Sequence, residues 1–391
     1  MPMNLANYFD YNATSPLLPA ARAALVEALD GGFGNPSSLH WAGRASRKIV
    51  DEARAELALL AGVDPSAVTF VGGATEALAQ VLHSNHAARV IASSLEHPAL
   101  GSAARVFGGR EVVSVPVRLR SPPEGAVDEA SLEDALREAA VGGREAVLAV
   151  MAAHNVTGLV LPRVRASTVM PDGAAHVGRV LVDAAQYAGR LCLKSLVAAG
   201  TAGAPDYVVL AAHKLGGPKG IGAILTKPGL GLEPIFPGGG QEGGRRGGTE
   251  AVPLIAAFGA AARYWREEGE GERARLAGLR DRFEAHLMNA RQDLAFVGRL
   301  GERLPQTSAL IVPAHLDGET VVRAMHRAGF AVSAGSACAS GSALPSPGLV
   351  ALGLSPNEAI RVVRISLGFF SDEAGTDALA SALIASFGDR A

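Results

Sequence analysis

Short apolar runs alternate with amphipathic segments between about residue 45 and residue 230. Segments 45–61 and 75–83 repeat their apolar positions with the spacing of a helix face. The apolar runs around and between them predict short buried strands over 68–71, 89–92, 112–117, 146–151, 180–183 and 207–211. Strands separated by helices predict an α/β fold in which a mostly parallel sheet is flanked by helices.

A stretch rich in glycine and proline, 228–248, interrupts this alternation. The pattern then predicts long helices over 252–270 and 271–289, shorter helices over 319–328 and 372–385, and strands over 309–312 and 361–367. These elements indicate a second, smaller α/β domain, and we expect the first dozen residues to pack with it. We therefore predict a large domain at 15–252 and a small domain formed by 1–14 and 253–391.

Composition limits the function classes. The chain has 391 residues, 48% of them hydrophobic, and a formal net charge of −2. A nucleic-acid binder is usually strongly basic, so we expect no nucleic-acid partner. No apolar run is long enough to cross a bilayer, and the first residues do not have the pattern of a secretion signal. We expect a cytoplasmic protein without a disulfide framework, since its only cysteines are Cys192 and Cys338.

A lysine and an acid each follow a predicted strand. Lys214 stands in a glycine-rich loop after the 207–211 run, and Asp183 ends the 180–183 run, with Gln186 close behind. A lysine held by such a loop and partly desolvated favours the neutral amine that forms a Schiff base. Pyridoxal 5'-phosphate requires a lysine for its aldehyde and a carboxylate for its ring nitrogen. The pair therefore predicts a pyridoxal-phosphate site, and no metal is expected.

The segment Gly72-Gly73-Ala74-Thr75 joins a predicted strand to a predicted helix. Backbone N–H groups at a helix N-terminus, together with the Thr75 hydroxyl, favour a phosphate site. The alternative is a tight turn in which Thr75 caps the helix.

Two further polar residues follow strands. His97 comes after the 89–92 run and could stack on a flat cofactor and move protons, or could simply be solvated. Asn155 follows the 146–151 run and could bind a carboxylate or a ring oxygen, or could form an Asx turn. We expect most other histidines to be solvated: His40, His83, His86, His176, His286, His315 and His326.

Two segments in the C-terminal half carry candidate chemistry. The glycine-rich run that contains Arg246 and Thr249 is either a linker or an anion clamp. Cys338 lies among small residues, which favours an exposed, reactive thiol over a buried one, whereas Cys192 between leucines is interpreted as apolar filler.

Two arginines lie on the 361–367 run. Arg361 and Arg364 are separated by an odd number of positions and should face opposite sides of a strand. One of them could bind a carboxylate through its forked guanidinium, and the other should be solvated.

Together these segments resemble the cysteine desulfurases of the class-V aminotransferase family, which have the pyridoxal-phosphate-dependent transferase fold. The match begins with Phe9-Asp10-Tyr11-Asn12-Ala13-Thr14-Ser15-Pro16 and runs through Phe33-Gly34-Asn35-Pro36-Ser37-Ser38 to the Arg364 strand. Its most specific parts are His213-Lys214, the glycine-rich run ending in Thr249, and Gly335-Ser336-Ala337-Cys338.

The resemblance implies roles for these residues. Lys214 would bind the cofactor aldehyde, Asp183 the ring nitrogen and Gln186 the ring hydroxyl, while His97 would stack on the ring and move protons. The phosphate would be bound by Gly73, Ala74, Thr75, His213 and, from the other subunit of a homodimer, Thr249. Asn155 and Arg364 would hold the substrate carboxylate. Cys338 would attack the sulfur of L-cysteine, producing alanine and an enzyme persulfide for a sulfur-acceptor or scaffold protein.

Two departures from the family pattern keep alternatives open. Ala211 stands where the family has a serine, which removes a phosphate-binding hydroxyl, and Val156 replaces an acid expected at the edge of the site. The alternatives are a selenocysteine lyase, another aminotransferase-like enzyme, or a degenerate relative that only binds a sulfur-acceptor protein.

Overall fold

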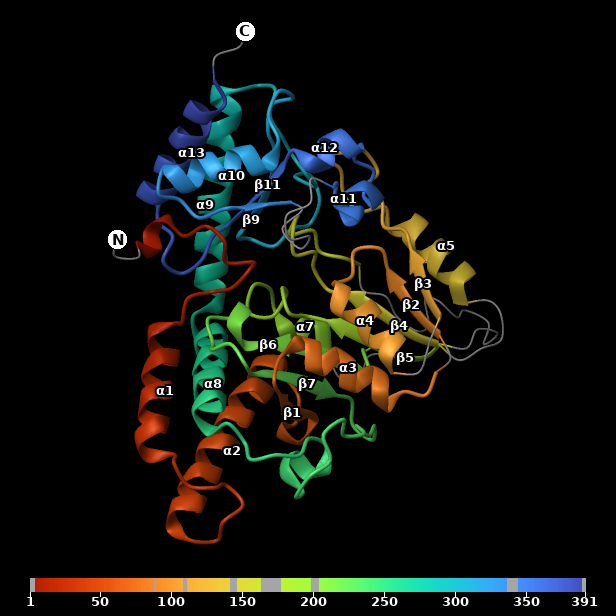
Figure 1. Cartoon of the computed structure of the whole chain (residues 1–391), viewed down its shortest axis with the longest axis vertical. Helices are drawn as coiled ribbons and strands as arrows, with labels where there is room; N and C mark the ends of the chain where they lie inside the picture. The colour runs from red at the N-terminus through yellow and green to blue at the C-terminus, as the bar shows by residue number, and fades with distance from the viewer. Residues whose placement is uncertain are drawn as a thin grey trace.

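The computed structural model describes residues 4–87, 89–107, 111–140, 146–162, 177–197, 204–335 and 344–388. Figure 1 shows a larger α/β part in the lower half of the view and a smaller one above it. The N-terminal segment starts at the upper part and crosses to the lower one. None of the described helices combines the length and the hydropathy that a bilayer crossing requires.

The larger part is built on a seven-stranded sheet with the order β1-β7-β6-β5-β4-β2-β3. Its strands are β1 Val68–Val71, β2 Arg89–Ser93, β3 Glu111–Val115, β4 Ala146–Met151, β5 Val177–Asp183, β6 Tyr207–Ala211 and β7 Gly222–Thr226. All neighbours pair in parallel except β7, which is antiparallel to both β1 and β6. The predicted mostly parallel sheet is therefore confirmed. Strand β7 was missed because it returns directly from β6 through a loop, without the helix that marks the other connections.

Helices cover both faces of this sheet. They are α1 Pro19–Gly31, α2 Trp41–Ala61, α3 Ala74–Ser84, α4 Pro98–Val106, α5 Glu129–Ala140, α7 Leu193–Val197 and α8 Val252–Glu267, with short 3-10 turns η2 Pro65–Ala67, η3 Ala212–Lys214 and η4 Gln241–Gly244. Successive residues of β6 point to opposite cores: Leu210 packs with the α2 and α8 side, and Val209 with the α3 and α4 side. This alternation explains why the strand is apolar throughout.

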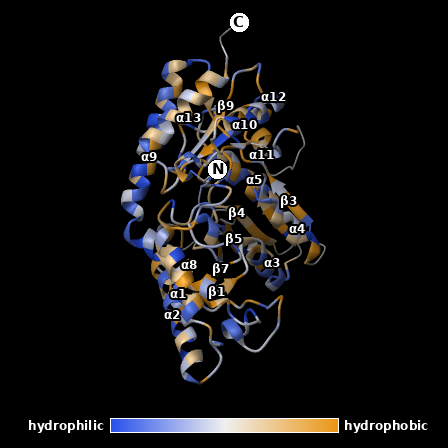
Figure 2. Cartoon of the chain, turned by 60° about the vertical axis from the view of Figure 1, so that its left-hand side comes forward, coloured by the Kyte–Doolittle hydropathy of each residue, from blue (hydrophilic) through white to orange (hydrophobic). Residues whose placement is uncertain are grey.

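The smaller part holds a four-stranded antiparallel sheet with the order β10-β11-β9-β8. Its elements are β8 Ala295–Phe296, β9 Thr307–Ile311, β10 Ser333–Ala334, β11 Val362–Ser366, α9 Gly269–Ala290, α10 Gly318–Arg327, α11 Pro347–Ala351, α12 Pro356–Ile360, α13 Glu373–Ser386 and η1 Leu5–Asn7. Helix α9 follows α8 almost directly and extends upward along the molecule, where hydrophilic residues colour much of its length (Figures 1 and 2).

The N-terminal segment contacts both parts, whereas the first dozen residues were expected to pack with the smaller one. Phe9 N–H donates to the Ala331 carbonyl at 2.9 Å, and Tyr11 N–H donates to the Ser366 carbonyl at 3.3 Å, both in the smaller part. Four residues later, Ser15 N–H donates to the His213 carbonyl at 2.8 Å in the larger part. Residues 8–15, here called the N-terminal strap, therefore cross between the two sheets. The domain boundaries proposed above stay a prediction.

Tyr11 anchors the N-terminal strap, and its ring packs closely against Gly368. Tyr11 is completely buried, and a Cβ placed on Gly368 would come within 2.0 Å of its ring. We therefore expect Gly368→Ala to lower the free energy of unfolding by about 1–3 kcal/mol through overpacking. Urea unfolding measures this change. Gly278→Ala is the matched control, because its new methyl group meets nothing within 4 Å, and it should raise stability by about 1 kcal/mol.

Candidate functional site

A cavity of about 910 Å³ opens where strands of the large sheet end, facing the N-terminal strap. Most of the predicted site residues line it: Gly73, Ala74, Thr75, His97, Asn155, Asp183, Gln186, His213, Lys214 and Arg364. All of them except Arg364, which lies on β11 of the smaller sheet, follow or end strands of the large sheet, because the carboxyl ends of its parallel strands meet at one edge. The structure therefore brings together residues that are up to about three hundred positions apart.

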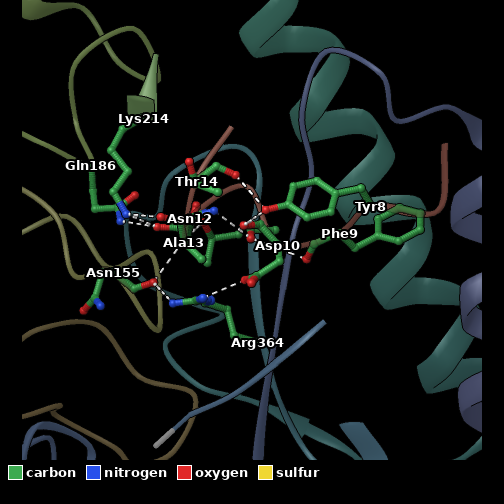
Figure 3. A network of polar contacts seen from close by, with 12 residues as sticks. Tyr8, Phe9, Asp10, Asn12, Ala13, Thr14, Asn155, Gln186, Lys214 and Arg364 are labelled. Carbon is green, nitrogen blue, oxygen red and sulfur yellow. Dashed lines mark hydrogen bonds and ion pairs between the residues drawn. The ribbon is translucent and has the colours of Figure 1, made fainter. Parts of the chain in front are cut away.

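Lys214 ends the short η3 turn after β6, and its backbone is held from several sides. Arg190 Nη2 donates to the Lys214 carbonyl at 2.9 Å, and Trp265 Nε1 donates to the next carbonyl, of Leu215, at 2.8 Å. The Lys214 amine extends into the cavity and donates to the Asn12 carbonyl at 2.5 Å and the Ala13 carbonyl at 2.8 Å (Figure 3). The amine thus lies in a fixed place, as a Schiff-base lysine requires.

Asp183 ends β5, and its Oδ1 accepts the Ala185 N–H at 2.9 Å. Burial raises the pKa of Asp183, while this backbone bond and the charges of His97 and Lys214 act in the opposite direction. A buried carboxylate that lacks a strong cationic partner is stabilised by a cation placed beside it. The protonated nitrogen of an aromatic ring is such a cation, so Asp183 fits the ring of pyridoxal phosphate.

The start of α3 lines the cavity with the first turn of a helix. The N-cap position is Gly73, which makes no side-chain cap, and a Cβ placed there would meet nothing within 4 Å. The alternative that Thr75 caps the helix is therefore wrong, since Thr75 lies in the first turn and lines the cavity. N–H groups of a first turn that face an open cavity fit the phosphate of the cofactor.

Two histidines with lowered pKa values line the cavity. Desolvation lowers the pKa of His213 to about 4, and its Nδ1 lies 3.2 Å from Thr14 Oγ1. Desolvation also lowers the pKa of His97, whose Nδ1 accepts the Ala99 N–H at 3.2 Å at the start of α4. Because Nδ1 of His97 is an acceptor, its ring proton belongs on Nε2.

Arg364 lies on β11 with its side chain only 4% exposed. Its Nη2 contacts Asp10 Oδ1 at 2.7 Å, and its Nη1 donates to the Asn155 carbonyl at 3.2 Å (Figure 3). The prediction that Arg361 shares this strand was wrong. Arg361 is the C-cap of α12 just before the strand begins; its side chain is partly exposed, and its guanidinium donates to the Val312 carbonyl at 2.6 and 2.8 Å.

The glycine-rich loop is neither a linker nor a clamp for this chain's own cavity. Arg246 pairs with Glu76 at 2.9 Å, and Glu250 pairs with Arg47 at 2.6 Å. Glu242 adopts φ of 52° and is held by a bidentate pair with Arg54, at 2.7 and 2.8 Å. Ion pairs at three points therefore order a segment whose composition is typical of a flexible chain.

Thr249 follows this loop and is exposed, outside the described lining of the cavity. Cys338 lies outside the described residues. The interpretation of Cys192 as buried filler was wrong, because it is exposed just before α7.

One of the two departures lies where it was expected. Ala211 lines the cavity, whereas Val156 is 6% exposed and packs in a hydrophobic core with β4 instead of standing at the edge of the site.

Sequence reasoning missed several residues that line the cavity: Asp10, Asn12, Ala13, Thr14 and Lys219. Four of them belong to the N-terminal strap. The sequence of the strap contributed to the family resemblance, but no role in the site was predicted for its polar residues. It also missed Glu96, whose Oε1 accepts from Ser93 Oγ at 2.5 Å and Met151 N–H at 2.7 Å. Glu96 thereby joins the ends of β2 and β4 beneath the site.

Comparisons with known proteins agree with this geometry. The family model described as aminotransferase class-V matches residues 7–379. "Cysteine desulfurase IscS 1" of Archaeoglobus fulgidus is 32% identical, with 96% of this chain and 95% of that protein covered. "Cysteine desulfurase" of Cereibacter sphaeroides is 34% identical, with 96% and 94% covered. A solved structure of a NifS-like protein is similar with a TM-score of 0.82 and 26% identity, covering 97% of this chain and 99% of that one.

Burial raises the pKa of Glu96 to about 8, and the charge of Asp183 adds to this shift. The folded protein therefore binds a proton that the unfolded chain releases near pH 4.5, so Glu96 lowers the stability progressively as the pH rises from about 4.5 to about 8. Glu96→Gln keeps both accepted hydrogen bonds without the charge. We expect it to be more stable than the wild type at pH 8 and equal to it near pH 4.5, as measured by urea unfolding.

The exposed carboxylate of Glu138 provides the control for this measurement. Glu138→Gln should change the stability by less than about 0.5 kcal/mol at every pH. If the gain from Glu96→Gln stays the same between pH 5 and pH 8, the shifted titration is refuted.

Proposed function

This chain belongs to the class-V aminotransferase family, and from that premise we propose that it is a pyridoxal-phosphate-dependent cysteine desulfurase. The observation that carries the proposal is the cavity itself. It places a lysine, a carboxylate, a neutral histidine and a buried arginine from distant parts of the chain around one volume large enough for a cofactor and a small amino acid.

The residues around the cavity fit pyridoxal phosphate. Lys214 would hold its aldehyde carbon, Asp183 its ring nitrogen, Gln186 its ring hydroxyl, and the first turn of α3 with His213 its phosphate. When bound, the cofactor supplies an electron sink for the amino acid attached to it. Asp183 favours this chemistry because a carboxylate beside the ring nitrogen keeps that nitrogen protonated.

Arg364 and Asn155 would orient the substrate. The guanidinium of Arg364 is buried and fixed at two points, so it can bind the carboxylate of an amino acid without first losing side-chain freedom. His97 would transfer protons through Nε2, which is the ring nitrogen left free by the bond from Ala99 to Nδ1. Desolvation lowers its pKa, and because Nδ1 accepts from Ala99, Nε2 carries the ring proton and would donate it toward the substrate.

Sulfur transfer would occur at Cys338. Its thiolate attacks the sulfur of L-cysteine, the bond between that sulfur and the substrate Cβ breaks, and a sulfur–sulfur bond forms. The electron pair of the broken bond goes to the substrate Cβ, which takes up the one proton that the Cys338 thiol releases, so that cysteine and one enzyme thiol become alanine and one enzyme persulfide. The persulfide then passes its outer sulfur to an acceptor protein in the cytoplasm, for iron–sulfur cluster assembly or for thiolation.

We infer that the working form is a homodimer in which Thr249 completes the phosphate site of the other subunit. The exposed position of Thr249, next to a loop that ion pairs hold in place, supports this inference. A fixed loop can present a hydroxyl to a second copy without a large ordering cost.

The decisive experiment is persulfide trapping on the purified enzyme after incubation with L-cysteine, followed by mass mapping of both cysteines. We expect alanine in the solution and the persulfide on Cys338. Cys338→Ser should abolish both sulfur release and the trapped adduct, because no nucleophile remains to accept the sulfur. Cys192→Ser is the matched control and should keep full activity.

The same experiment separates the alternatives. A keto acid formed without any need for Cys338 would identify an aminotransferase. A preference for selenocysteine without sulfur release from cysteine would identify a selenocysteine lyase. A colourless protein that retains an acceptor protein would identify a degenerate binding relative.

Cofactor attachment and substrate binding should be separable by mutation. Lys214→Ala should abolish the yellow absorbance of the purified protein, because the covalent link to the cofactor is lost. Arg364→Ala should keep that absorbance and raise the KM for cysteine about a hundredfold, since a buried, charge-assisted bond to the carboxylate is removed. Absorbance spectra and steady-state kinetics measure the two effects, and an equal loss of both in Arg364→Ala would contradict its role.

A further inference from the structure

The arginine expected to bind the substrate already has an anionic partner. Asp10 lines the cavity, and its Oδ1 lies 2.7 Å from Arg364 Nη2, while the Asp10 side chain is 19% exposed (Figure 3). The Asn155 carbonyl accepts from Nη1, and Nε of Arg364 is buried without a partner among the described residues. The guanidinium is therefore only partly satisfied, with an acid beside the place where a substrate carboxylate would bind.

The backbone of the N-terminal strap prevents Asp10 from withdrawing. The Asp10 main-chain carbonyl accepts from Ala13 N–H at 3.0 Å and from the Tyr8 hydroxyl at 3.1 Å. Asp10 also forms a parallel bridge with Ser366 on the same strand that carries Arg364. The backbone of Asp10 is therefore held on both sides, which keeps its side chain within reach of Arg364.

We propose that Asp10 sets the affinity and selectivity of the site for amino-acid carboxylates by sharing Arg364 with them. The inference rests on the proposed function, in which Arg364 binds the substrate carboxylate. Two carboxylates on one guanidinium repel each other. The repulsion between Asp10 and the substrate carboxylate therefore offsets part of the attraction between Arg364 and the substrate. The site therefore binds the carboxylate more weakly than an unshared arginine would, which favours release of alanine after each turnover.

Asp10→Asn tests the proposal, because asparagine keeps an oxygen that can accept from Arg364 Nη2 but removes the charge. We expect the dissociation constant for L-alanine to fall about tenfold, which corresponds to about 1.4 kcal/mol. The KM for L-cysteine should fall in parallel, with the change in KM larger than any change in kcat. L-Alanine binding is measured by titrating the absorbance of the holoenzyme, and competition by propionate should tighten in the same proportion.

Asp281→Asn provides the matched control, because Asp281 pairs with Arg280 on an exposed helix face and the substitution removes the same charge. It should leave the L-alanine affinity unchanged. In an Arg364→Ala background, Asp10→Asn should no longer tighten L-alanine binding, because the effect acts through the shared guanidinium.

Unchanged or weaker binding in Asp10→Asn would overturn the proposal and indicate that Asp10 only positions Arg364. Should that variant fold poorly, Asp10→Ser removes the charge with a smaller side chain and is judged by the same outcomes. The L-alanine titration does not depend on sulfur release. A protein that forms no persulfide but shows tighter alanine binding in Asp10→Asn would refute the desulfurase activity and retain the role of Asp10.

Discussion

One buried residue, Asn12, holds together the two sheets and the cavity between them. Its side-chain amide donates to Thr307 Oγ1 at 2.9 Å and to the Asn155 carbonyl at 3.1 Å, and its side-chain oxygen accepts from Gln306 at 3.1 Å. Its main-chain carbonyl accepts from Gln186 and Lys214. Because Asn12 is 1% exposed, losing any of these partners would leave a buried polar group unsatisfied, which is costly. The position of Lys214 therefore depends on the smaller sheet as well as on its own loop.

The environment around this network disfavours unpaired charge. Desolvation lowers the pKa of His97 and His213, and burial raises the pKa of Asp183 and Glu96. Neutral histidines can accept protons, and a carboxylate in such a place gains most from a cationic ring nitrogen beside it. The same low polarity strengthens the attraction between Asp10 and Arg364. Burial of the cavity wall thus acts on all of these charged and titratable groups at once.

The glycine-rich loop shows how composition and structure can disagree. Its many glycines favour a flexible linker, yet carboxylates and arginines from α2 and α3 hold it at several points. The partners of Arg54 and Arg47 on this loop lie about two hundred positions away in sequence, so no local pattern could predict them. Thr249 is exposed and lies between Arg246 and Glu250, which both form ion pairs with helices of the large part. These ion pairs hold the backbone on either side of Thr249.

Local patterns in the sequence predicted eight of the described strands, helices α2, α3, α8, α9, α10 and α13, and candidate polar residues at several strand ends, but not helices α1, α4 and α5. Strand β1 was predicted at its observed bounds, and Lys214, Asp183, His97 and Thr75 were found because each follows a short apolar run. Such patterns are contained within a few consecutive residues, so they can be identified without knowledge of tertiary contacts. Only the tertiary structure decided the antiparallel β7, the start of β11 after Arg361, the exposure of Cys192, and the crossing of the N-terminal strap that brings Asp10 to Arg364. These features depend on pairings between distant segments, whose energies no single stretch of sequence contains.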